Sequence, residues 1–402
     1  MNKAVATFQG LTNLQKILVL IILATAIYVA STSISYSLLS KINIQTPAGQ
    51  EDIKATLPTP TNALTEDPNE PKTEECPLNG VMHTKKAKDS WEKRRPLAVM
   101  IENHAEARPQ SGLSFTDVVY EAVAEGGITR FMALFYCNLS DVQVGPVRSA
   151  RTYYLDWLGE YNALYAHVGG ANAPGPADAL GQIIKYEVKD LNQFSIGFPV
   201  FWRDYQRLGH SVATEHTMYS TTQKLWEVGA KRGWTASDSA GIRWESKFTP
   251  WKFKEEKSPV DSSSKGGGTT NKITVNFWES QSGYQVEWAY DPLSNSYKRK
   301  NGGAAHMDLD NNTQLSPKVV VIQFEKESNA NDGYPGNVHL LYGTTGSGKT
   351  LIFQDGIVTE GKWIKQSRIS RTKYVDLKGK EIQFNRGQIW IQTVPEGSKV
   401  SF

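Results

Sequence analysis

The spacing of apolar residues along the first half of the chain predicts strands followed by helices. Three largely apolar runs have the length and composition of buried strands, at residues 96–102, 117–123 and 130–137. Apolar residues then recur at helical spacing at 149–164 and at 220–230. This pattern predicts a mixed α/β domain over residues 89–241.

The pattern changes after about residue 241. Short runs rich in β-branched and aromatic residues, such as KITVNFWES and KVVVIQF, are separated by Gly, Asn, Asp and Pro. Strands at this spacing predict a β-rich domain over 242–402, with a flexible Ser- and Gly-rich loop at 258–270. The fold class is therefore α+β: a mixed α/β N-terminal domain and then a β-rich C-terminal domain, behind one N-terminal transmembrane helix.

The transmembrane helix is predicted from residues 17–39, which carry no charge and are long enough to cross a bilayer. Lys3 and Lys16 precede this run, so residues 1–16 are predicted to be a cytoplasmic tail. The protein is then single-pass in the cytoplasmic membrane, with its N-terminus inside and its bulk extracytoplasmic. The alternative is a cleaved signal peptide, because the strongest apolar part, 17–30, has signal-peptide length. No cysteine directly follows the run, which argues against a lipid anchor.

Residues 40–88 are predicted to be a disordered spacer, since most of this stretch is rich in Pro, Thr and acidic residues and poor in aromatics. Cys76 and Cys137 are the two cysteines of the 402-residue chain. In an exported protein such a pair favours one disulfide, which would link the start of the folded region to a core strand. Two unrelated thiols are the alternative.

Residues 343–350 read GTTGSGKT and match the pattern of a nucleotide-binding P-loop. A P-loop must lead into a helix, but the residues after Thr350 carry Asp355-Gly356 and Glu360-Gly361 between short β-rich runs. The segment is therefore predicted to be a turn in a β meander that binds no nucleotide. The formal net charge of +3 also gives no reason to expect a nucleic-acid partner.

Polar residues gather where the predicted strands of the first region end. They are Glu102, Asn103 and His104 after the first strand, Glu121, Glu125 and Arg130 around a Gly-Gly turn, Arg148 and Arg151 before a helix, and His167 at a further strand end. Arginines near a helix N-terminus can hold a carboxylate or phosphate, and Glu and His at strand ends can do acid–base work or hold a metal. These residues predict one functional cleft, for which a buried structural ion-pair network is the alternative.

Several of these motifs resemble those of the YerB-like family, a bacterial domain of unknown function numbered 3048. The motifs are RPLAVMIENHAEARPQSGL, VVYEAVAEGGITRF and GPVRSAR, followed in the second half by VEWAYD, AAHMD, FQDG and IWIQTVP. The resemblance covers about residues 90–402 and adds His216 to the candidates, because it matches the histidine of a Pro-His-Asn motif that this chain otherwise lacks. Relatives are often lipoproteins, and the resemblance implies no activity.

Three functions fit these observations. The first is an envelope-anchored protein that touches the bilayer through residues 17–39 and binds an anionic or polar cell-wall or envelope ligand in the cleft. The second is an envelope hydrolase, metal-assisted or not, that uses a glutamate as base and histidines as ligands or acids. The third is a structural or scaffolding module. Binding is preferred, since the chain shows no motif of a metalloprotease or serine hydrolase, and no metal ion or cofactor is assigned.

Overall fold

The computed structural model describes residues 12, 15, 66–256 and 272–402. The predicted transmembrane anchor at 17–39 lies outside the described residues, as do most of the predicted spacer and all of the loop at 258–270. None of the helices in the described part of the chain combines the length and the apolar composition needed to cross a membrane.

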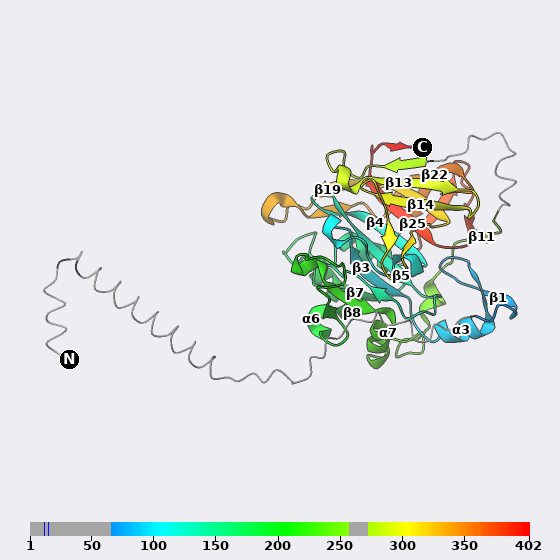
Figure 1. The fold of residues 1–402 in the computed structure, drawn as a ribbon, viewed down its shortest axis with the longest axis horizontal. Helices are drawn as coiled ribbons and strands as arrows, with labels where there is room; N and C mark the ends of the chain where they lie inside the picture. The colour runs from blue at the N-terminus through cyan, green and yellow to red at the C-terminus, as the bar shows by residue number, and fades with distance from the viewer. Residues whose placement is uncertain (1–11, 13–14, 16–65, 257–271) are drawn as a thin grey trace. The chain divides into compact units, whose positions relative to one another are not determined.

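A ten-stranded sheet is the largest sheet among the described residues (Figure 1). In spatial order it consists of β23 (Lys373–Asp376), β22 (Ile357–Lys365), β21 (Gly346–Gln354), β18 (Val319–Glu325), β25 (Ile389–Pro395), β4 (Val118–Glu125), β5 (Ile128–Phe135), β3 (Leu97–Glu102), β7 (Leu164–His167) and β8 (Lys189–Asn192). The central strands are almost continuously apolar, and every residue of β3 and β18 is buried, as expected for strands covered on both faces.

The same sheet contains strands from both regions that the sequence separates. β25 pairs in parallel with β18 on one side and with β4 on the other. β4, β5 and β3 confirm the three strands expected from the apolar runs of the first region. The division into domains at 89–241 and 242–402 stays a prediction, and one sheet contains strands of both regions.

A five-stranded sheet accompanies the large one, in the order β15 (Ala304–Ala305), β14 (Ser296–Asn301), β13 (Val286–Asp291), β12 (Lys272–Val275) and β26 (Val400–Ser401). The remaining strands form small sheets: β1 (Lys72–Glu75) with β2 (Met82–Thr84), β6 (Gln143–Val144) with β10 (Met218–Thr221) and β9 (Trp202–Arg203), β11 (Phe253–Lys254) with β24 (Phe384–Asn385), β16 (Met307–Asp308) with β17 (Thr313–Gln314), and β19 (Glu327–Asn329) with β20 (Leu340–Tyr342). The described part is thus rich in β structure, in agreement with an α+β class.

The described helices are short: α3 (Lys85–Trp91), α4 (Thr152–Leu158), α5 (Ala179–Lys185), α6 (Gln193–Ile196) and α7 (Thr222–Lys231). α7 packs beside β3, β7 and β8 (Figure 1). α4 begins three residues later than predicted, because the main chain of Arg148 and Ala150 bonds to Met100 and Gly169 and stays extended. α7 begins two residues later than predicted, and the Thr221 side chain caps it.

The predicted disulfide between Cys76 and Cys137 is confirmed, with the two Cα atoms 6.0 Å apart. It joins the turn between β1 and β2 to the residues that follow β5. The buried carboxylate of Asp117 lies beside it and accepts hydrogen bonds from the backbone N–H groups of Tyr136 and Cys137, at 2.6 and 3.1 Å. The bond therefore fastens the N-terminal end of the described fold to a central strand.

The segment that resembles a P-loop is a strand and not a loop leading into a helix. Residues from Gly346 on form β21, which pairs with β22 in an antiparallel hairpin. Asp355 and Gly356 turn the hairpin with φ angles of 56° and 68°, the positive values that a tight two-residue turn requires. The predicted strand–turn–strand context is therefore present, while the absence of nucleotide binding stays a prediction.

Candidate functional site

Five charged residues of the predicted cleft come together at one end of β3, β4 and β5. Glu102 ends β3 and lies opposite Arg130 of β5. β4 contains a register shift between Val123 and Glu125, which turns Glu125 to the face that carries Arg130. Glu121 is paired with the residue after Arg130, so it points to the opposite face of the sheet. In a regular strand Glu121 and Glu125 would lie on the same face, and the bulge therefore places them on opposite faces of the sheet.

Glu125 is held by two arginines. Its Oε1 atom lies 3.0 Å from Nη2 of Arg130, and its Oε2 atom contacts Nη2 of Arg151. Arg130 also donates from Nη1 to the carbonyl oxygen of Ser149 at 2.8 Å. Burial raises the pKa of Glu125, but the two guanidinium groups outweigh it and lower this pKa to about 2. Glu125 is therefore ionised and fully engaged at neutral pH.

Glu102 is held by Arg148 and by His216. Its Oε1 atom lies 3.1 Å from Nε of Arg148, and its Oε2 atom accepts a hydrogen bond from Nδ1 of His216 at 2.8 Å. This hydrogen bond raises the pKa of His216, whereas burial lowers the pKa of Arg148. The pair fixes the imidazole so that its Nε2 atom faces away from Glu102.

We refer to Glu102, Glu125, Arg130, Arg148 and Arg151 as the arginine–glutamate cluster. It contains three guanidinium groups and two carboxylates, so it carries one excess positive charge. Arg130 and Arg151 are buried, with 3% and 7% of their side-chain surface exposed, whereas Arg148 exposes 24%. The guanidinium group of Arg148 also donates no hydrogen bond to the part of the chain that the structure describes. The cluster is a paired network with one incompletely paired arginine at its surface.

His104 and His216 lie next to this cluster with their rings stacked, 4.6 Å apart between centroids and 11° from parallel. His104 is the N-cap of the 3₁₀ turn Ala105–Ala107, and His216 ends a second such turn, Thr214–His216. Glu106, from the first of these turns, lies 3.6 Å from Nε2 of His216 and exposes 59% of its side chain. Sequence analysis selected both histidines but missed Glu106.

Asn103 and Glu121 belong to a different, fully buried network. Glu121 accepts hydrogen bonds from Arg299 at 2.8 Å and from the indole N–H of Trp390 at 2.9 Å. Asn103 donates to Thr129 at 2.6 Å, and Thr129 in turn donates to Glu121 at 2.9 Å. Glu121 and Arg299 expose no side-chain surface. These two candidates therefore join the two halves of the chain and do not face the cluster.

His167 is buried apart from the other candidates. Its ring nitrogens contact the carbonyl oxygen of Gly169 and a carboxylate oxygen of Asp190, both at 2.7 Å. Both nitrogens therefore have partners inside the fold. Because neither ring nitrogen is available to Glu102 or His216, the contacts of His167 hold β7 and β8 together and do not extend to the cluster.

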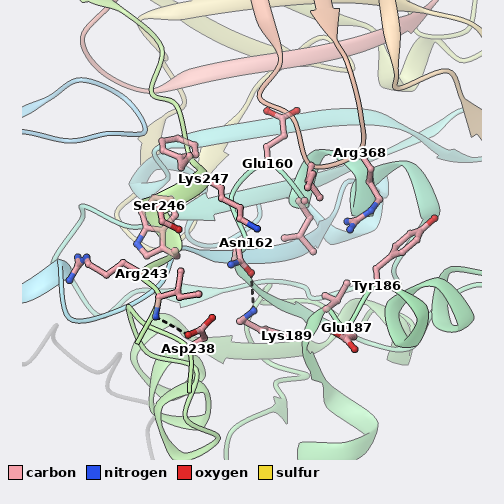
Figure 2. A pocket seen from close by; sticks show the side chains of 18 residues that line it. Glu160, Asn162, Tyr186, Glu187, Lys189, Asp238, Arg243, Ser246, Lys247 and Arg368 are labelled. Atoms are coloured by element: carbon pink, nitrogen blue, oxygen red, sulfur yellow. Dashed lines mark hydrogen bonds between the residues drawn. The ribbon is translucent and has the colours of Figure 1, made fainter. Parts of the chain in front are cut away.

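A cavity of about 270 Å³ lies elsewhere, between α4, the start of β8 and the segment around Trp244 (Figure 2). Lys189, Lys247 and Arg368 line it, and Arg368 lies 4.1 Å over the ring of Tyr186. Lys189 donates to Asn162 at 2.8 Å, as drawn in Figure 2. None of the ten candidate residues lines this cavity, so it is a concave region separate from the arginine–glutamate cluster.

Two family models, both described as being of unknown function, match the chain. A family model described as "Protein of unknown function (DUF3048) N-terminal domain" matches residues 81–235, and one described as "Protein of unknown function (DUF3048) C-terminal domain" matches residues 273–391. The chain belongs to this family, which confirms the resemblance found in its motifs.

Two comparisons give the relatives. The chain is 29% identical over 334 residues to the protein named "Putative lipoprotein YerB" of Bacillus subtilis (strain 168), covering 82% of this chain and 88% of that protein. It is also similar to the crystal structure of YerB protein from Bacillus subtilis, with a TM-score of 0.66 and 26% identity. That match covers 82% of this chain and the whole of the solved one.

These comparisons correct the predicted localisation. The chain was expected to cross the cytoplasmic membrane once through residues 17–39, whereas the relative carries the name of a lipoprotein. The apolar length of the run supported the expectation, but length alone does not distinguish an anchor from an export signal. We therefore withdraw the single-pass transmembrane assignment.

Proposed function

We propose that the chain binds an anionic ligand of the cell envelope, and that Arg148 holds the anionic group. The observation that carries this proposal is the state of Arg148. It is the partly exposed arginine of the cluster, it lies beside Glu102, and its guanidinium group donates no hydrogen bond within the described residues. A guanidinium group has five N–H donors, so it can still receive a carboxylate or phosphate in bidentate fashion.

The rest of the cluster supports this role by charge and by position. Arg130 and Arg151 share the carboxylate of Glu125, and Arg148 pairs with Glu102. Three guanidinium groups thus face two carboxylates. The main chain of Arg148 is held on both sides, because its N–H donates to the carbonyl oxygen of Met100 and its carbonyl oxygen accepts from the N–H of Val168, which fixes where the side chain starts. A preorganised cation of this kind binds an anion with little loss of conformational entropy. The envelope part of the proposal rests on the lipoprotein name of the relative.

Titration of the full chain with inorganic phosphate and with acetate tests the proposal by calorimetry. Saturable binding of at least one of them is expected, and Arg148→Ala should weaken it about 10-fold or more, since a charge-assisted hydrogen bond contributes roughly 1.5–3 kcal/mol. Arg386→Ala is the matched control, because Arg386 has 21% side-chain exposure and is also ion-paired. The affinity of this control variant for phosphate and acetate should equal that of the unmodified chain.

Equal affinity in the Arg148→Ala variant and in the unmodified chain would reject the proposal. A scaffolding role would then be the better interpretation, because every charge of the cluster would serve the fold alone. The Arg148→Lys variant separates the contribution of the positive charge from that of the bidentate geometry. If bidentate geometry matters, lysine restores the charge but not the affinity.

A further inference from the structure

A group of three metal-binding side chains lies beside the arginine–glutamate cluster. His104, Glu106 and His216 each offer one ligand atom, and these atoms all lie within 4.8 Å of one another. They come from two short turns more than a hundred residues apart in the chain, Ala105–Ala107 and Thr214–His216. Two imidazoles and one carboxylate are a ligand set that Zn²⁺ takes with one position left open.

The hydrogen bond to Glu102 prepares His216 for this task. Nδ1 of His216 donates to Oε2 of Glu102 at 2.8 Å, so the neutral imidazole has its free lone pair on Nε2. That atom faces Glu106, whose Oε2 is 3.6 Å away, too far for a hydrogen bond but close to the separation of two ligands on one metal ion. A carboxylate behind a ligating histidine fixes the tautomer and strengthens the ligand, as in metal sites generally.

Of the other histidines whose contacts the structure describes, His83 and His339 also have a carboxylate oxygen at Nδ1, from Glu66 at 3.1 Å and from Asp332 at 2.7 Å, but neither lies in a group of three ligand side chains among the described residues. Both ring nitrogens of His167 have partners within the fold, and His306 is buried between Arg299 and Gln110. His104 is half-buried, its ring stacks on that of His216, and its side chain makes one long hydrogen bond, in which Nδ1 accepts from the backbone N–H of Glu106 at 3.3 Å. The side chain of Glu106 is exposed.

We infer that His104, Glu106 and His216 bind a divalent transition-metal ion of the zinc class, with Glu102 positioning His216. The charge around the group favours a cation, because Glu102, Glu106 and the exposed Glu215 all lie near the two imidazoles. Arg148 lies next to the same carboxylate, with its Nε atom 3.1 Å from Oε1 of Glu102. The open metal position and Arg148 would then face the same anionic group, so this inference deepens the proposed function and its last step rests on it.

Zinc binding to the full chain, freed of metal with a chelator, is the test. Calorimetry with ZnCl₂ should show one ion bound per chain. Co²⁺ should give the visible absorption of a four-coordinate site. His104→Ala and Glu106→Gln each remove a partly or fully exposed ligand and leave the core intact, and each should weaken zinc binding about 10-fold or more. His210→Ala, which removes an exposed histidine of the same segment, should change nothing.

Two further variants separate this inference from the proposed function. Glu102→Gln should weaken zinc binding about 10- to 100-fold although Glu102 is no ligand, because the amide cannot orient His216 in the same way. Arg148→Ala should keep the zinc affinity and lose only the affinity for phosphate. No zinc binding, or zinc binding that survives both His104→Ala and Glu106→Gln, would overturn the metal site and leave the arginine proposal standing.

Discussion

At the scale of single residues, the position of Glu125 is the decisive feature of the cluster. Without the bulge in β4, its side chain would point to the face of the sheet that holds Glu121. With the bulge, the carboxylate of Glu125 lies between the buried guanidinium groups of Arg130 and Arg151 and reduces the repulsion between their charges. This carboxylate therefore contributes to the stability of the fold as well as to the charge of the cluster.

The low pKa of Glu125 predicts how stability depends on pH. Its pKa in the folded chain is about 2, against an ordinary value of 4.5, so its contribution is fully present above about pH 4.5. This contribution is lost as the pH falls from there toward 2. We expect Glu125→Gln to cost roughly 2–3 kcal/mol at pH 6 and much less at pH 3, a range that allows for partial solvent screening. Urea unfolding of the variant and of the unmodified chain at both pH values measures this difference in the free energy of unfolding.

A constant difference between the two chains across this pH range would contradict the assignment. Glu360→Gln is a suitable control, since Glu360 forms an ion pair with Lys349 in which both side chains are 52% exposed. Exposed pairs of this kind contribute little, so its effect should be close to zero at both pH values.

At the scale of elements, the hairpin of β21 and β22 shows why a sequence motif needs its structural context. Lys349, the lysine of the P-loop pattern, points out of β21 and pairs with Glu360 at 3.0 Å. A strand directs alternate N–H groups to its two neighbours, so they cannot converge on one phosphate as they do in a P-loop.

Lys349→Ala should therefore leave both the fold and any nucleotide interaction unchanged. The expected loss of stability is below about 1 kcal/mol, because the pair is exposed. Titration with ATP and GTP should show no saturable binding by either chain. Micromolar affinity that disappears in the variant would reverse the conclusion.

The sequence predicts the elements of the fold better than the site. β3, β4 and β5 are predicted because strands covered on both faces are apolar throughout. The bulge that turns Glu125 leaves no mark in the spacing of apolar residues, so Glu121 and Glu125 were grouped together. Glu106 escaped notice because its partner His216 is 110 positions away and only the tertiary fold brings them together.

At the scale of the whole molecule, β25 connects the two halves that composition separates. It lies between β18 and β4, and its Trp390 and Gln392 side chains both bond to Glu121 of β4. Arg299 of β14 completes this network, with its guanidinium 4.7 Å from the ring centre of Trp390. The buried pair of Glu121 and Arg299 therefore makes the halves depend on each other.

A fragment that ends at residue 256 should consequently fail to fold, although it contains the whole arginine–glutamate cluster. It lacks β25, so β4 would expose an apolar edge and Glu121 would be buried without its partner, a loss of roughly 3–5 kcal/mol from the ion pair alone. Circular dichroism and proton NMR of the fragment should show no cooperative unfolding transition. A folded fragment would demonstrate two independent domains.

The place of β25 also bears on how the protein is made. Every other strand of the large sheet precedes it in the chain, so the ribosome completes the centre of the sheet last. Until then β4 and β18 each present an unpaired edge, the kind of surface that joins to other chains and aggregates. Folding of the large sheet therefore waits for almost the entire sequence, and until then the incomplete chain has two strand edges open to aggregation.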